Sequence, residues 1–100
     1  MTFSLAVRAL CLNQSIQYST ADGEPTGLGS MKILEIDPAF ILIQPQNGKP
    51  RRVTQKDWDE VDKHWSQLLK SGTHRQYMHN SRNVTYVLSI RAFLELDNKK

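Results

Sequence analysis

Residues 71–96 read SGTHRQYMHNSRNVTYVLSIRAFLEL, and this stretch predicts a short helix, a tight turn and a longer apolar helix. Thr73 can cap the short helix, whereas Asn80 and Ser81 interrupt it and can cap its successor. Five apolar residues then recur at helical spacing, namely Val84, Val87, Leu88, Ile90 and Leu94. Two helices joined by a short turn are the outline of a helix-turn-helix. We therefore predict that the chain ends in such a pair of helices.

Positive charge gathers around this predicted turn. Arg75, Arg82 and Arg91 all lie between Gly72 and Phe93, a span that holds no acidic residue. The side chains expected to face a partner here are Arg75, Arg82, Asn83 and Thr85. Arginine can bond to guanine edges and asparagine to adenine edges in the major groove of DNA. The arrangement favours contact with duplex DNA, and the alternative is a solvated face on a small helical subdomain.

Length and composition restrict the class of protein. One hundred residues, with 39% hydrophobic and 23% charged side chains, fit one soluble globular domain over residues 1–100. The net charge of +3 permits a nucleic-acid or acidic partner without requiring one. The single cysteine, Cys11, excludes an internal disulfide, and we expect a small buried residue in a reducing cytoplasm. No apolar run is long enough to span a membrane.

The first thirty residues have a less regular pattern. Residues 2–13 suit either a helix or a strand, and we favour a helix that is apolar nearly all round. Ile16 and Tyr18 alternate with polar residues, which is typical of a short edge strand. Residues 21–30, ADGEPTGLGS, contain three glycines and a proline, so we expect a loop there.

Residues 31–53 predict a three-stranded antiparallel meander. In residues 31–37, Met31, Ile33, Glu35 and Asp37 alternate with Lys32, Leu34 and Ile36, which predicts a strand. A tight Asp-Pro turn joins this strand to the apolar run at residues 40–43. That run is apolar on both faces, so we expect other elements to cover each side of it. An Asn-Gly pair then predicts a hairpin into a third strand at residues 51–53.

Three basic residues follow this Asn-Gly turn: Lys49, Arg51 and Arg52. They can contact phosphate at the tip of a loop. They can equally keep an edge strand soluble and unpaired by their charge. We include all three among the candidate nucleic-acid-binding residues.

Residues 54–71 predict a structural helix at the start of a helical half that spans residues 54–96. Thr54 can cap it, with Asp57 three residues later as an approximate capping box. Its expected buried stripe is Trp58, Val61, Trp65, Leu68 and Leu69. The acids around Trp58 argue against a tryptophan platform for stacking bases, so we place both tryptophans in the core.

Together these elements predict an α+β fold: an N-terminal helix or strand, a small antiparallel meander and a three-helix C-terminal half. Over roughly residues 31–96 the order of elements and the arginine-bearing turn resemble a winged helix-turn-helix domain. In that family the hairpin wing normally follows the recognition helix, whereas here the hairpin around residues 46–52 precedes the helices.

No catalytic or metal-binding pattern stands out. His64, His74 and His79 match no zinc spacing, and the acids early in residues 54–71 suit the helix dipole. We therefore predict a non-enzymatic binding protein without a metal or cofactor, which contacts duplex DNA through its helix-turn-helix.

Two other functions remain open. The protein could be a homodimer or protein-interaction module that self-associates through residues 2–13 and 40–43, with no role in nucleic-acid binding. It could also hold a small ligand between sheet and helices. Arginines gathered on one exposed face would favour DNA, and scattered or acid-paired arginines would favour the interaction module.

Overall fold

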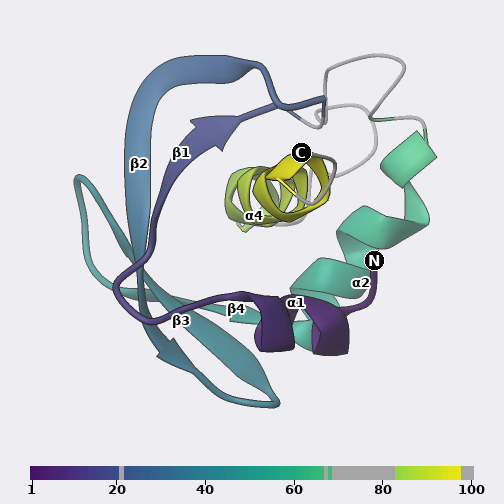
Figure 1. Cartoon of the computed structure of the whole chain (residues 1–100), viewed down its shortest axis with the longest axis horizontal. Helices are drawn as coiled ribbons and strands as arrows, with labels where there is room; N and C mark the ends of the chain where they lie inside the picture. Colours follow the sequence, from purple (N-terminus) through teal and green to yellow (C-terminus); the bar gives the residue numbers. More distant parts are fainter. Residues whose placement is uncertain (21, 67, 69–82, 98–100) are drawn as a thin grey trace.

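The molecule is built around one central helix. The computed structural model describes residues 1–20, 22–66, 68 and 83–97 of the chain. Helix α4 (Val84–Asp97) lies at the centre, and a strongly curved antiparallel sheet wraps around one side of it (Figure 1). Helices α1 (Phe3–Ala9) and α2 (Gln55–Lys63) lie on other sides of α4. The predicted α+β fold, with an N-terminal helix, an antiparallel sheet and C-terminal helices, is confirmed.

The sheet has four strands: the predicted meander and, beside it, the edge strand expected around Ile16 and Tyr18. They are β1 (Ser15–Ser19), β2 (Pro25–Ile36), β3 (Phe40–Pro45) and β4 (Arg51–Thr54). Their order in the sheet is their order in the chain, and each neighbouring pair is antiparallel. The side chains on the concave face are buried in the hydrophobic core, including Ile16, Met31, Ile33, Ile41, Ile43 and Val53. This alternation fixes the register, because a slip of one residue would turn the apolar set outward.

The prediction of a loop at residues 21–30 was wrong for its second half. Residues 25–30 are the start of β2, where Pro25 pairs with Ser19 and Ser30 pairs with Gln17 of β1. Pairing with β1 holds residues 25–30 as a strand, although their local composition predicts a loop. Gly27 and Gly29 have positive φ angles of 75° and 126°, which allow β2 to bend as it curves past α4.

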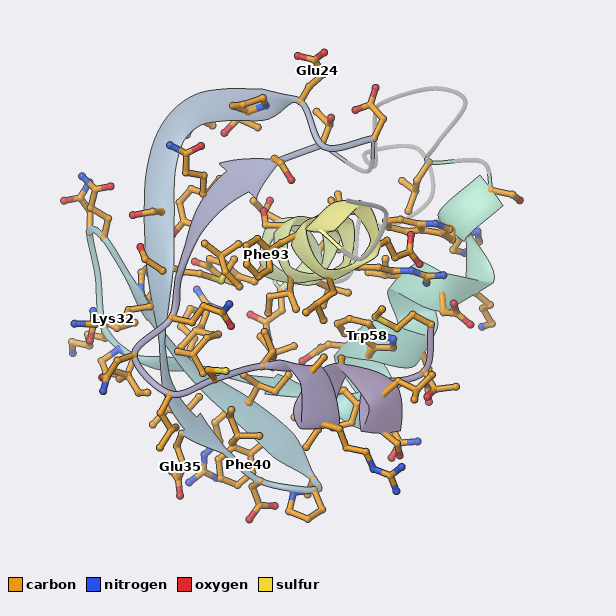
Figure 2. All side chains as sticks on the ribbon, in the orientation of Figure 1. Glu24, Lys32, Glu35, Phe40, Trp58 and Phe93 are labelled. Atoms are coloured by element: carbon orange, nitrogen blue, oxygen red, sulfur yellow. The ribbon has the colours of Figure 1, made fainter. Side chains whose placement is uncertain are left out.

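Residues 40–43 were expected to be covered on both faces, and among the described residues only one face is fully buried. Ile41 and Ile43 are buried, whereas Phe40 and Leu42 are only partly buried. Figure 2 shows Phe40, together with Lys32 and Glu35, on the side of the sheet away from α4. Only the concave face of the sheet is therefore packed against α4.

Helix α1 settles the choice between helix and strand for the N-terminal segment. The Thr2 hydroxyl accepts a hydrogen bond from Leu5 N at 3.2 Å and caps the helix. Phe3 and Ala6 are buried, but Leu5 is 52% exposed. Cys11, expected to be buried, is exposed because the helix has ended and the chain turns toward β1.

Helix α2 follows β4 directly and has the predicted cap. The Asp57 carboxylate accepts from Thr54 N at 3.0 Å, while Asp57 N donates to the Thr54 hydroxyl at 3.3 Å. The helix is shorter than predicted, because it ends at Lys63 and turns at His64 before helical geometry resumes. The predicted buried positions Trp58, Val61, Trp65 and Leu68 are confirmed, whereas Leu69 lies outside the described residues. Trp58 lies between α1 and α2, where its Nε1 donates to Met1 O at 3.0 Å.

Helix α4 confirms the apolar spacing from which the fold was predicted. All five of the apolar residues expected there are buried, and so are Ser89 and Arg91. The shorter helix predicted between Thr73 and Asn80 lies outside the described residues. Across the part of the chain that is described, no helix is long and apolar enough to cross a membrane.

Candidate functional site

Two adjoining hollows open where the β3–β4 turn meets the start of α4. The tyrosine hollow, of about 260 Å³, is lined by Tyr18, Leu28, Pro45, Gln46, Asn47, Thr85 and Tyr86. The basic hollow, of about 300 Å³, is lined by Pro45, Asn47, Gly48, Lys49, Pro50, Arg51 and Tyr86. The two hollows share Pro45, Asn47 and Tyr86, so they lie side by side, and together they are called the groove.

Two aromatic side chains from opposite ends of the sequence form the tyrosine hollow. Tyr18 comes from β1 and Tyr86 from the first turn of α4, and their ring centres lie 5.9 Å apart with the planes tilted by 53°. Burial raises the pKa of the Tyr18 phenol above its ordinary value of 10.0. The neighbouring Tyr86 phenol raises this pKa further, and a hydrogen bond with the Gln46 backbone lowers it. Both tyrosines line the tyrosine hollow.

The basic hollow brings a cation against the same aromatic ring. Arg51 pairs with Ile43 across β3 and β4, on the concave side of the sheet. Its guanidinium carbon lies 5.7 Å from the centre of the Tyr86 ring, which is within cation–π range. Lys49 is exposed at the outer end of the same hollow. The predicted residues Lys49, Arg51 and Thr85 thus line one groove.

Two other predicted residues lie elsewhere and make structural contacts. Arg52 points to the convex side of the sheet, where its guanidinium carbon lies 4.7 Å from the centre of the Phe40 ring. The Asn83 side-chain amide donates to Arg52 O at 2.8 Å and to the Asp57 carboxylate at 2.9 Å. Asn83 therefore joins the start of α4 to β4 and to the cap of α2. Arg75 and Arg82 lie outside the described residues.

A glycine outside the groove lies close to two of the residues that line it, Gln46 and Tyr18. The Gln46 side-chain oxygen accepts a hydrogen bond from Ser30 N at 3.1 Å. A Cβ atom at Gly29 would lie 2.8 Å from that oxygen and 3.6 Å from the Tyr18 ring. Gly29 therefore allows β2 to approach the β3–β4 turn closely enough for Gln46 and Tyr18 to line the same hollow.

The sequence analysis missed the two tyrosines, and one signal for Tyr18 was available. Tyr18 alternates with Ile16 in β1, so both side chains belong to the concave face. Tyr86 lies between Thr85 and the buried Val87, at a position that the helical spacing of apolar residues does not include. The place of Tyr86 in the groove depends on its contacts with Arg51 and Tyr18, which are distant in sequence.

The described lining of the groove is positively charged. None of the described residues that line the two hollows carries a carboxylate, so Lys49 and Arg51 make the groove attractive to anions. Within the described ranges, no three His, Cys, Asp or Glu side chains gather closely enough to hold a metal ion. His74 and His79 lie outside those ranges.

Comparisons of the chain with protein-family models, with curated proteins and with solved structures found no match.

Proposed function

We propose that this protein binds nucleic acid through the groove formed by the β3–β4 turn and the start of α4. The observation that carries the proposal is the position of Arg51 over the Tyr86 ring, at the junction of the two hollows. Nucleic acids present phosphates and aromatic bases at regular intervals. A groove that combines cations with partly exposed aromatic rings matches both of these features.

The burial of α4 supports this choice of surface. Val87 through Ala92 are all buried, so the first turn of α4, with Thr85 and Tyr86, is the part that adjoins the groove. The β3–β4 turn adds Lys49 and Arg51 beside that turn. Contact with duplex or single-stranded DNA would therefore use a composite surface of sheet and helix.

Salt-dependent titration tests the proposal directly. Fluorescence anisotropy should show binding to labelled, mixed-sequence DNA at low salt, with affinity falling as salt is added. The logarithmic slope should be about −0.9 per phosphate contacted on duplex DNA and about −0.7 on a single strand. No binding of either form at low salt would reject nucleic-acid binding as the function of this groove.

Paired variants locate the contact. Lys49→Gln should flatten the salt slope by roughly one phosphate contact, whereas Lys32→Gln, on the convex face, should leave it unchanged. Arg51→Gln and Arg52→Gln form a second matched pair, because the two arginines are neighbours in β4 that point to opposite faces. Equal losses within either pair would show that the groove is not the contact surface.

Self-association is a second candidate function, favoured by exposed apolar side chains near the N-terminus. Leu5 and Leu12 are 52% and 60% exposed, beside the exposed Cys11. Burying them against a second copy would gain the free energy of removing apolar surface from water. Sedimentation equilibrium should then give a dimer at tens of micromolar protein, and Leu5→Asp should give a monomer. A monomeric wild type would reject this function.

A reducing cytoplasm suits either function, because it keeps Cys11 a thiol.

A further inference from the structure

We infer that the tyrosine hollow takes an unpaired nucleobase while the basic hollow takes the adjoining phosphate, so that the protein prefers single-stranded nucleic acid. This inference rests on the proposed function and specifies its ligand. It follows from three features of the groove: the aromatic walls of one hollow, the positive charge of the other, and their shared boundary.

The tyrosine hollow has the surfaces that a planar base needs. Tyr18 and Tyr86 supply aromatic faces, and Leu28 and Pro45 supply apolar walls. Leu28 is 76% exposed, so a ligand in the hollow would cover a large apolar side chain that now contacts water. Stacking on aromatic rings is favourable for every base, because each base has a π-face.

Neutral polar groups surround the same hollow and can bond to base edges. Ser30 N holds the Gln46 side-chain oxygen, which fixes the orientation of that amide. Asn47 and Thr85 add an amide and a hydroxyl to the lining. Amide and hydroxyl groups can match the donors and acceptors on the Watson–Crick edge of a base, which is available only when the base is unpaired.

The basic hollow is placed for the phosphate of the same nucleotide. It shares Pro45, Asn47 and Tyr86 with the tyrosine hollow, so a base and its neighbouring phosphate can occupy both hollows together. Lys49 and Arg51 then face the phosphate, with the guanidinium also close to the Tyr86 ring. A duplex would first have to unpair and unstack a base, which carries a free-energy cost that a single strand largely avoids.

Four DNA ligands of equal length test the inference in one anisotropy series: an intact single strand, a strand with abasic spacers, a fully paired duplex, and a duplex with one unpaired base. The intact strand should bind roughly tenfold or more tightly than the abasic strand. The duplex with the unpaired base should bind more tightly than the paired duplex. Equal affinity of the intact and abasic strands would overturn the inference while leaving the proposed function standing, and failure of all four ligands would overturn both.

Variants and a competitor complete the test. Tyr86→Leu should abolish the difference between intact and abasic strands, whereas Tyr86→Phe, which keeps the aromatic face, should preserve it. Single strands made of one base each, one strand for each of the four bases, would be ranked by affinity in the same assay. Asn47→Ala changes an exposed residue that lines the tyrosine hollow, so it should alter that ranking. Thermal melting shows whether each variant is folded. Adenosine monophosphate, added as a competitor, should displace the strand only at far higher concentration, and displacement at equal concentration would identify a free nucleotide as the ligand instead.

Discussion

The guanidinium carbon of Arg91 lies 4.1 Å from the centre of the Trp65 ring, where α4 meets the helical turn that follows α2. The Arg91 side chain is only 6% exposed, and it is paired with the carboxylates of Asp62 and Glu95. The Trp65 ring therefore covers one face of this buried cation, while its N–H groups donate to the two acids. Arg91, one of three arginines near the predicted helix-turn-helix, is part of the core.

Arg91→Ala should lower the free energy of unfolding by about 2–3 kcal/mol. Breaking a fully buried ion pair costs roughly 3–5 kcal/mol, and the loss here is smaller because Asp62 and Glu95 can still reach water. Arg91→Lys keeps the charge but loses the planar stacking on Trp65, so its loss should be intermediate. Urea denaturation of the wild type and of the two variants measures these free energies of unfolding. A wild-type midpoint for Arg91→Ala would contradict a structural role.

Trp65→Ala should cost about 3–5 kcal/mol, because the ring is 9% exposed and packs within the core. Trp65→Phe retains an aromatic face for Arg91 and should cost distinctly less. If both substitutions left the melting temperature unchanged, Trp65 would have to be exposed in solution, and a role in stacking on bases would become relevant for this residue.

The cap of α2 should stabilise more than its own helix. Thr54→Ala removes one half of the capping box and should cost about 1 kcal/mol. Asn83→Ala should cost a similar amount or more, because it frees both the Asp57 carboxylate and Arg52 O from the Asn83 amide. Asn83→Ala is best compared with Asn47→Ala, which changes an exposed residue, by urea denaturation. Equal midpoints for the two asparagine variants would contradict the joining role of Asn83.

Gly29→Ala should destabilise the protein more than Gly27→Ala. Both residues have positive φ, so each alanine carries a backbone penalty of about 1 kcal/mol or more. At Gly27 the new methyl group meets nothing within 4 Å, whereas at Gly29 it would press against the Gln46 side-chain oxygen. Moving Gln46 would also break its bond to Ser30 N. The difference in melting temperature between the two variants measures the cost of displacing Gln46. Equal melting temperatures would show that Gln46 adjusts freely.

The local elements of this fold could be predicted, and the non-local ones could not. The spacing in α4 and the cap of α2 are written in neighbouring residues, so the sequence predicts both. The first half of β2 has a loop-like composition, and its order comes from pairing with β1, which no local pattern contains. The burial of Ser89 also depends on a contact that is distant in sequence. Its hydroxyl donates to Thr85 O at 2.7 Å and accepts from Ser19 N of β1 at 3.0 Å.

Only the part of the candidate site that depends on neighbouring residues could be predicted from the sequence. Lys49 and Arg51 follow an Asn-Gly turn, so their placement near a hairpin tip could be expected. The separation of Arg51 from Arg52 follows from strand alternation, which places neighbours on opposite faces. The meeting of Tyr18 and Tyr86 depends on how the sheet curves around α4, and no pattern within either segment encodes it.

Alkaline pH should destabilise the protein through Tyr18. Because its pKa is raised in the folded state, the unfolded chain loses this proton first as pH rises through about 10. The stabilising contribution is therefore complete below pH 10 and is lost as pH climbs through the folded-state pKa. Tyr18→Phe removes the titrating group, so its unfolding free energy should fall less steeply than that of wild type across this range. The difference in phenolate absorbance between the two proteins measures the Tyr18 pKa, and a midpoint at or below 10 would contradict the burial of this phenol in the groove.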